Sequence, residues 1–209
     1  MKKKLQWVVT GVITILSFQV IAQDGNVKTI FNGNLRSSGG YGAITNKFTT
    51  IRGDYANLVG LYGGWYINHR FMVGVGGAAS TNNLHVPQQF STNPIHSRTW
   101  QYCQFGMTTE YVMHSDKAIH LAFHLFGGAG FTLQYRRDDW DHNSHDNVSD
   151  ENWFVVAEPG VQLEINLFKW MRLSPGVSYR ATFGSDGRGL PDSDLSAISY
   201  NATAKFGVF

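Results

Sequence analysis

Apolar and polar residues alternate along residues 119–135 in a way that predicts one long β-strand. Every odd residue of this segment is apolar, aromatic or glycine, whereas the even row carries His120, His124, Thr132 and Gln134. Side chains of a strand point alternately to its two faces, so this strand has one apolar and one mixed face. Strands of soluble proteins usually have about five or six residues, and a tilted membrane strand needs about 9 to 11. The length therefore raises the question whether the apolar face meets lipid or a protein core.

Seven further segments show the same alternation, each bounded by turn residues. The eight predicted strands cover residues 40–51, 55–67, 71–79, 99–112, 119–135, 153–167, 171–183 and 198–209. A polar row facing solvent and an apolar row facing a core is also the pattern of a soluble β-sandwich. The alternation alone leaves both architectures open.

The lengths of the connections favour a membrane barrel. Links after the second, fourth and sixth strands are tight, at about residues 68–69, 114–117 and 168–170. Links after the third, fifth and seventh strands are long and polar, at about residues 80–98, 136–152 and 184–197. Short turns at one end and long loops at the other are typical of outer-membrane barrels, and aromatic residues gather at the strand ends. The sequence thus predicts an all-β, eight-stranded, antiparallel up-and-down transmembrane β-barrel with both termini on the short-turn side.

The first residues have the pattern of a secretory signal peptide. Three lysines, Lys2 to Lys4, precede an apolar stretch, and Val20 and Ala22 stand at the positions that a signal peptidase reads before a cut. We therefore expect a signal peptide over residues 1–22 and a single barrel domain over residues 23–209, exported to the bacterial outer membrane. An uncleaved anchor is the alternative, which the polar residues within the stretch disfavour.

Charge and cysteine content exclude some classes of function. The chain has 17 basic and 15 acidic side chains, and loss of the three lysines in residues 1–22 leaves 14 basic ones. Such a balance does not favour nucleic-acid binding, which needs a basic patch. The single Cys103 has no partner for an internal disulfide, so the core or the closure of a sheet must hold the exported chain together.

Two glycine-rich stretches carry a family resemblance. Residues 39–77, with the turn in YINHRF and the glycines that follow it, resemble the opening of small glycine-rich outer-membrane β-barrel proteins of Bacteroidetes. Residues 106–130 look like the matching central hairpin. The resemblance implies an OmpA/OmpX-like barrel, a monomer in outer-membrane lipid, with no catalytic residues. Phe209 departs from the usual assembly signal, because it is one residue out of step with the apolar row of Phe206 and Val208.

Charged side chains fall repeatedly on the face that would point inward. An eight-stranded barrel is just wide enough for its side chains to fill the interior, and buried charges must be paired. We therefore predict a lumenal charge network made of Glu110, Glu158, Glu164, Arg172, Arg180 and Lys205, with Lys47, His120 and His124 on the same face. His120 and His124 are about 13 Å apart along the strand and do not chelate one metal. A narrow conducting pore is the alternative.

The link 136–152 is the most charged segment and the predicted recognition surface. Its candidate residues are Asp138, Asp139, Trp140, Asp141 and His142. Their spacing does not match a calcium-binding loop, and no Ser in the chain has a Gly-x-Ser-x-Gly context, so we expect no metal, no cofactor and no catalysis. The predicted role is structural, or recognition and adhesion through surface loops with an extracellular or envelope ligand. A soluble periplasmic ligand-binding barrel of the lipocalin kind is the alternative.

Overall fold

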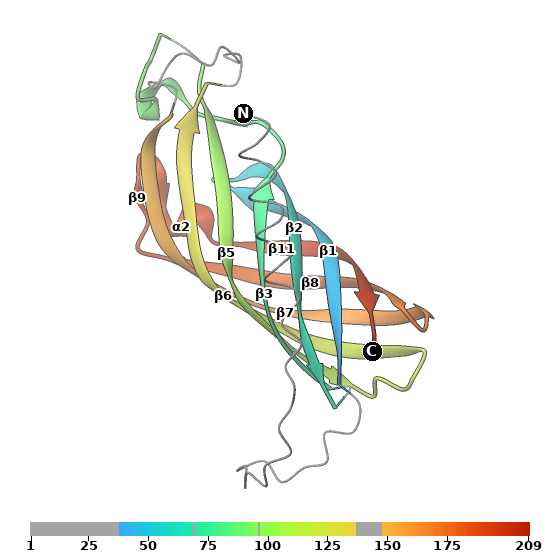
Figure 1. The fold of residues 1–209 in the computed structure, drawn as a ribbon. Coiled ribbons are helices and arrows are strands. Elements are labelled where there is room, and N and C mark those ends of the chain that lie inside the picture. Colours follow the sequence, from blue (N-terminus) through green and yellow to red (C-terminus); the bar gives the residue numbers. More distant parts are fainter. Residues whose placement is uncertain (1–37, 69, 96, 137–147) are drawn as a thin grey trace, which may run out of the picture. The chain divides into compact units, whose positions relative to one another are not determined.

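Eight long antiparallel strands form a closed ring in the computed structural model, which describes residues 38–68, 70–95, 97–136 and 148–209 (Figure 1). The strands are β1 (Ser38–Ile51), β2 (Asp54–Ile67), β3 (Phe71–Ser80), β5 (Thr99–Met113), β6 (Ile119–Tyr135), β7 (Val148–Phe168), β8 (Met171–Phe183) and β11 (Ala197–Gly207). Their order is β3-β2-β1-β11-β8-β7-β6-β5, and β3 also pairs with β5, which closes the ring. The predicted eight-stranded antiparallel barrel is confirmed.

Turn chemistry and pairing fix the ends of the strands. Arg52 and Gly53 join β1 to β2 with φ values of 57° and 81°, as required for a two-residue hairpin whose turn matches the strand twist. Strand β7 begins at Val148, five residues before the predicted start, because Val148 pairs with Tyr135 beyond an irregularity in the register. The last strand ends at Gly207 and not at the predicted residue 209.

The apolar rows face outward around the ring. Leu61 and Val75 expose 63% and 66% of their surface, and apolar or aromatic side chains of all eight long strands are similarly open. The inward rows hold the buried charged and polar side chains, together with buried apolar ones such as Leu58, Phe126 and Phe154. This is the reverse of the lipocalin-like alternative, in which the apolar row lines a cavity. A helix long and apolar enough to cross a bilayer does not occur among the described residues.

Inward-facing glycines make room for the large side chains of the interior. A Cβ added to Gly76 on β3 would lie 2.4 Å from the Cβ of Tyr62 on β2. Likewise, a Cβ on Gly130 would lie 2.2 Å from the ring of Phe154. The alternation of small and large residues therefore lets the narrow barrel close around its contents.

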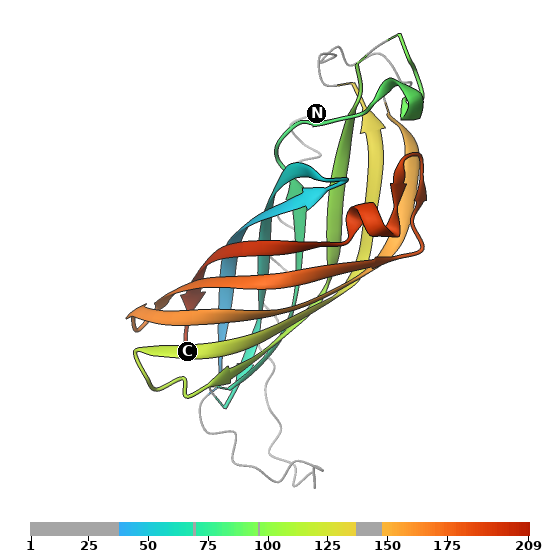
Figure 2. The ribbon, with the colours of Figure 1, turned by 180° about the vertical axis from the view of Figure 1, so that it is seen from behind.

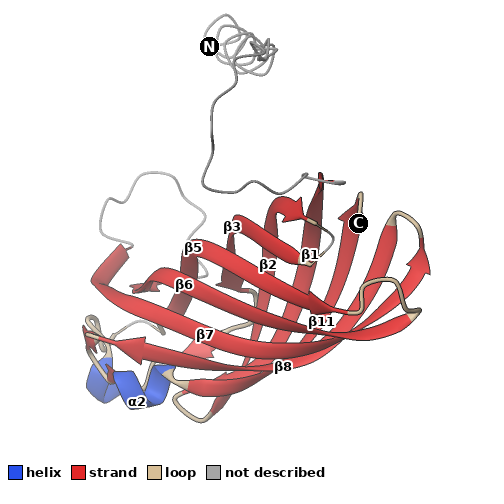
Figure 3. Ribbon diagram, turned by 90° about the horizontal axis from the view of Figure 1, so that it is seen from below, coloured by secondary structure: helices blue, strands red, loops and turns tan. Residues whose placement is uncertain are grey.

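The long links carry short elements that pack into one end of the barrel (Figure 2). They are β4 (Leu84–His85), η1 (Gln88–Phe90), β9 (Asp186–Gly187), β10 (Leu190–Pro191) and α2 (Asp192–Leu195). Leu84, Val86, Leu190 and Leu195 are buried in one apolar cluster with Trp100 and other barrel residues. Figure 3 shows α2 at the end of the ring opposite the C-terminus. The expectation of polar loops over residues 80–98 and 184–197 was incomplete, because four isolated apolar residues fold these links inward.

Candidate functional site in the barrel interior

Glu110 on β5 is the centre of a buried ion-pair cluster. Its carboxylate accepts hydrogen bonds from the hydroxyls of Tyr41 and Tyr62, the latter at 2.9 Å, and Lys205 Nζ donates to it at 2.8 Å. His124 Nδ1 lies 3.1 Å from its Oε1 atom. Only 1% of the surface of Glu110 is exposed. Partners from four other strands therefore satisfy this carboxylate in place of water.

Glu164 on β7 extends the same cluster. It accepts hydrogen bonds from Lys205 Nζ and from Arg172 Nη1, the latter at 2.9 Å. His120 Nε2 lies 2.8 Å from its Oε2 atom. The strand register places these groups, since His120 is directly opposite Glu164 and Lys205 is directly opposite Arg172. Lys205 joins the two carboxylates into one cluster in the short-turn half of the barrel. We call it the lower cluster, and its members are Glu110, Glu164, Arg172, Lys205, His120 and His124.

Glu158 on β7 forms a second centre farther toward the long-loop end. Lys47 Nζ lies 2.7 Å from each of its carboxylate oxygens. Ser178 Oγ donates to Glu158 at 2.6 Å, and Gln104 Nε2 donates at 3.0 Å. The geometry meets the condition under which a buried ion pair is tolerated, namely that further hydrogen bonds occupy the remaining lone pairs.

Arg180 belongs to a different structure, although it lies on the same inward row. Its Nε donates to the carbonyl of Leu195 at 2.7 Å, and its Nη2 donates to the carbonyl of Thr50 at 2.8 Å. The guanidinium also lies over the ring of Tyr102, 4.9 Å from the centroid. Within the described residues Arg180 makes no ion pair with a carboxylate. It attaches α2 to the barrel, and sequence patterns gave no signal for a partner that is a main-chain carbonyl.

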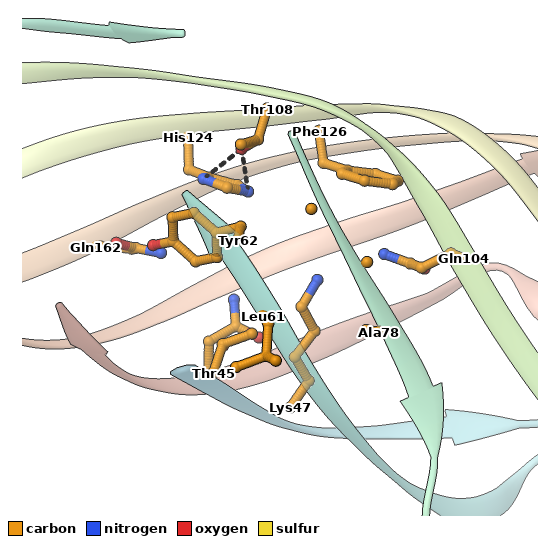
Figure 4. A pocket seen from close by; sticks show the side chains of 13 residues that line it. Thr45, Lys47, Leu61, Tyr62, Ala78, Gln104, Thr108, His124, Phe126 and Gln162 are labelled. Atoms are coloured by element: carbon orange, nitrogen blue, oxygen red, sulfur yellow. Dashed lines mark hydrogen bonds between the residues drawn. The ribbon is translucent and has the colours of Figure 1, made fainter. Parts of the chain in front are cut away.

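A small cavity in the barrel is lined by His124 of the lower cluster and by Lys47 of the second centre (Figure 4). Lys47, Gln104, Thr108, His124, Gln162 and Asn201 contribute polar groups to its lining. The volume open to the centre of a water molecule is about 30 Å³, and 10 to 15 Å³ on this scale is roughly one water. Gln162 Oε1 and Asn201 Oδ1 are buried, and neither has a hydrogen-bond partner among the residues that the structure describes. The cavity is therefore suited to about two bridging water molecules.

Phe209 lies at the short-turn mouth of the lumen. It continues the inward row of Thr203 and Lys205, which explains why it is out of step with the apolar row. The guanidinium of Arg172 is 4.1 Å from the centroid of the Phe209 ring, and the ring of Tyr41 is 5.3 Å away. The ring thus covers the lower cluster at this end.

Two predicted segments cannot be placed. The recognition residues Asp138, Asp139, Trp140, Asp141 and His142 lie outside the described residues, as does the predicted signal peptide over residues 1–22. In the part of the chain that the structure describes, no group of three or more His, Cys, Asp and Glu side chains is arranged to hold a metal ion. Sequence reasoning also missed Tyr41, Tyr62, Gln104 and Ser178 as partners of the carboxylates, although all four stand in inward rows.

A closed ring of antiparallel strands with an apolar outer face and a polar interior is the architecture of outer-membrane β-barrels. Solved structures with this fold are similar over most of the chain. A major outer membrane protein from Thermus thermophilus aligns with a TM-score of 0.56 at 10% identity, covering 82% of this chain and 99% of that one. Neisserial surface protein A aligns with a TM-score of 0.53 at 10% identity, covering 81% and 96%.

The N-terminal β-barrel domain of Pseudomonas aeruginosa OprF aligns with a TM-score of 0.50 at 9% identity, again covering 81% of this chain and 96% of that chain. At these identities the likeness concerns the fold. No protein-family model matches the sequence, and no curated protein is significantly similar to it.

Proposed function

We propose that this chain is an integral outer-membrane protein with a closed lumen, whose long-loop end binds an extracellular or envelope ligand. The single observation that carries the proposal is the filling of the interior. Paired charges occupy the short-turn half, and the apolar cluster around Leu84, Trp100 and Leu195 occupies the long-loop half. A barrel filled in this way supports the loops at its end and is not a transport channel.

The ion pairs oppose opening of the lumen. An ion path through the lower cluster would have to separate Lys205 from Glu110 and Glu164, which are almost completely buried. Loss of one partner of a buried pair costs about 3 to 5 kcal/mol, because the other charge is left uncompensated. Even then the apolar cluster lies across the path. We therefore propose that the protein does not form a steady pore.

The long-loop end is organised as one platform by Gln134 and Asp150. Gln134 Nε2 donates to the carbonyl of Phe90 and to Asp150 Oδ2, each at 2.9 Å, and Gln134 Oε1 accepts from Thr92 N at 3.1 Å. Asp150 Oδ2 also accepts from Arg188 N at 3.2 Å. Links that are far apart in the sequence are thus held together, which lowers the entropy cost of binding a partner.

Three measurements test the proposal. Fractionation should leave the protein in the detergent-extracted outer membrane, with heat-modifiable migration on gels, and recovery in the soluble periplasm would contradict the location. Planar-bilayer recording should show no reproducible conductance steps, whereas steps of constant size would contradict the closed lumen. The purified protein should retain a ligand from host-matrix or envelope extracts.

The segment around Asp138, Asp139, Trp140, Asp141 and His142 is our proposed contact for that ligand. Replacement of Asp138, Asp139 and Asp141 by Asn should reduce ligand retention, while the exposed Asp186→Asn serves as a control elsewhere on the same end. Equal retention by both variants would contradict the assignment. We propose neither catalysis nor a cofactor. N-terminal sequencing of the exported protein tests cleavage after residue 22, and the bacterial group suggested by the resemblance stays a prediction.

A further inference from the structure

The outer wall of the barrel is hollowed over four neighbouring strands. Phe206 on β11 is directly opposite Gly42 on β1, Gly42 is opposite Gly63 on β2, and Gly63 is opposite Val75 on β3. In this row across the wall, two glycines without side chains lie between the large side chains of Phe206 and Val75. The resulting groove has a volume of about 530 Å³ and is also lined by Ile44 and Leu61.

Aliphatic side chains end the groove toward the long loops. Ile44 is directly opposite Leu61, and these two residues expose 53% and 63% of their surface on the outward face. The side chains that line the groove carry no charge. The groove is therefore continuous with the apolar outer face, and most of its surface is apolar.

The β11 side of the groove, formed by Phe206, continues into aromatic residues near the short turns. The ring of Phe206 stacks on Trp170 with centroids 6.2 Å apart, and Trp170 stacks on Phe168 at 5.5 Å. Trp side chains are enriched at the headgroup level of a bilayer. Gly63 is four residues from Ile67, the end of β2, which is about 13 Å along the strand. Strands of such barrels tilt by about 35 to 45°, so this length spans about 10 Å of an apolar band about 25 Å tall, and the groove lies at acyl-chain depth on the short-turn side.

We propose that this groove is a binding site for one acyl chain of a phospholipid in the periplasmic leaflet, with the headgroup near Trp170. The inference rests on the proposed membrane location. The floor between Gly42 and Gly63 is two strands wide, with about 5 Å between the backbones, which suits one hydrocarbon chain. A second copy packed as a sheet would stand about 10 Å away and leave the floor empty.

A pair of matched glycines makes the proposal testable. A Cβ added at Gly42 meets no atom within 4 Å, so Gly42→Leu fills the groove without disturbing the wall. Gly127 on β6 is likewise open at its Cβ, faces outward and does not line the groove. Gly127→Leu therefore controls for a leucine added to the outer face. Heat-modifiable migration shows that each variant is folded.

The experiment uses the barrel in nanodiscs of phosphatidylethanolamine that carries a photoactivatable diazirine on one acyl chain. After illumination, mass spectrometry of peptides should show labelling of β1 and β2 around the groove several-fold above that of β5 and β6. Gly42→Leu should reduce this excess to the level of the other strands, and Gly127→Leu should preserve it. Equal labelling around the ring, no effect of Gly42→Leu, or cross-links between two copies at the groove would each overturn the proposal. Failure of the folded chain to enter nanodiscs would instead contradict the membrane location.

Discussion

Lys205 and Arg172 are directly opposite each other on β11 and β8, and Glu164 bonds to both of them. Like charges in opposed positions of a sheet destabilise it. The two cations share one carboxylate, so the arrangement depends on Glu164 keeping its charge. The carboxylate of Glu164, on a third strand, β7, therefore stabilises the inward face of the β8–β11 pair.

Glu164→Gln should destabilise the barrel strongly. The substitution keeps the size of the side chain but leaves Lys205 and Arg172 facing each other with less compensation, at a cost of about 3 to 5 kcal/mol. Urea unfolding in detergent micelles, followed by heat-modifiable migration, measures the change. Glu151→Gln, at an exposed position near the start of β7, should leave the midpoint in place. An unaltered midpoint for Glu164→Gln would mean that the bonds of Glu164 contribute no net stability.

Lys47→Met should cost stability that a second substitution restores. Alone it leaves the carboxylate of Glu158 buried without its cation, which costs about 3 to 5 kcal/mol. Lys47→Met combined with Glu158→Gln removes both charges and keeps one acceptor oxygen, for the bond from Ser178 or for the bond from Gln104, which reach different oxygens of Glu158. A double-mutant cycle by urea unfolding should give a large coupling energy. Additive losses would contradict a direct pairing.

The same double variant should remain non-conducting in planar bilayers. Removal of the Lys47–Glu158 pair leaves the lower cluster on one side and the apolar cluster with Leu84 and Leu195 on the other. Both still fill the lumen. Conductance steps in this variant, together with silence of the wild type, would show that the Lys47–Glu158 pair alone closes the barrel.

Arg180→Met should loosen α2 without opening the short-turn end. It removes two hydrogen bonds from a charged donor to the carbonyls of Thr50 and Leu195, each contributing about 1.5 to 3 kcal/mol. Limited proteolysis should then cut the link 184–196 faster. Arg188→Met is the matched control, because Arg188 is exposed and its backbone N–H, which bonds to Asp150, is retained. Equal cleavage of both variants would contradict the role of Arg180.

Gln134→Leu should increase motion across the long-loop platform. The change removes the side-chain donor that joins the Phe90 carbonyl to the Asp150 carboxylate, which keeps only its bond from Arg188 N. Hydrogen exchange measured by mass spectrometry should become faster in residues 88–93 and 148–151 and stay unchanged in β11. Gln88→Leu, at an exposed position of η1, should have little effect. Unchanged exchange in Gln134→Leu would mean that the links are held by other contacts.

The ring of strands could be predicted because apolar and polar residues alternate along each strand with a period of two. Alternation placed Glu110, Glu158, Glu164, Arg172 and Lys205 on the inward face, and the structure brings them into two clusters. The start of β7 was predicted five residues late, because residues 148–152 have no alternating apolar row and are in the strand through their backbone pairing with β6.

The residues that are buried at the long-loop end could not be predicted in the same way. Leu84 with Val86, and Leu190 with Leu195, are too few within their polar links to set a strand or helix period. Their burial depends on tertiary contacts, as does the pairing of Arg180 with main-chain carbonyls. Strand alternation assigns an inward face but carries no information on the partner that meets it there.

Ring closure and charge compensation are one event in this molecule. Glu110 on β5 takes its partners from β1, β2, β6 and β11, and β1 meets β11 only when the sheet is complete. A curled but open sheet would present that carboxylate, and Lys205 with it, without their counterparts. An open sheet therefore lacks the ion pairs that stabilise the closed one, so closure of the ring becomes a cooperative step.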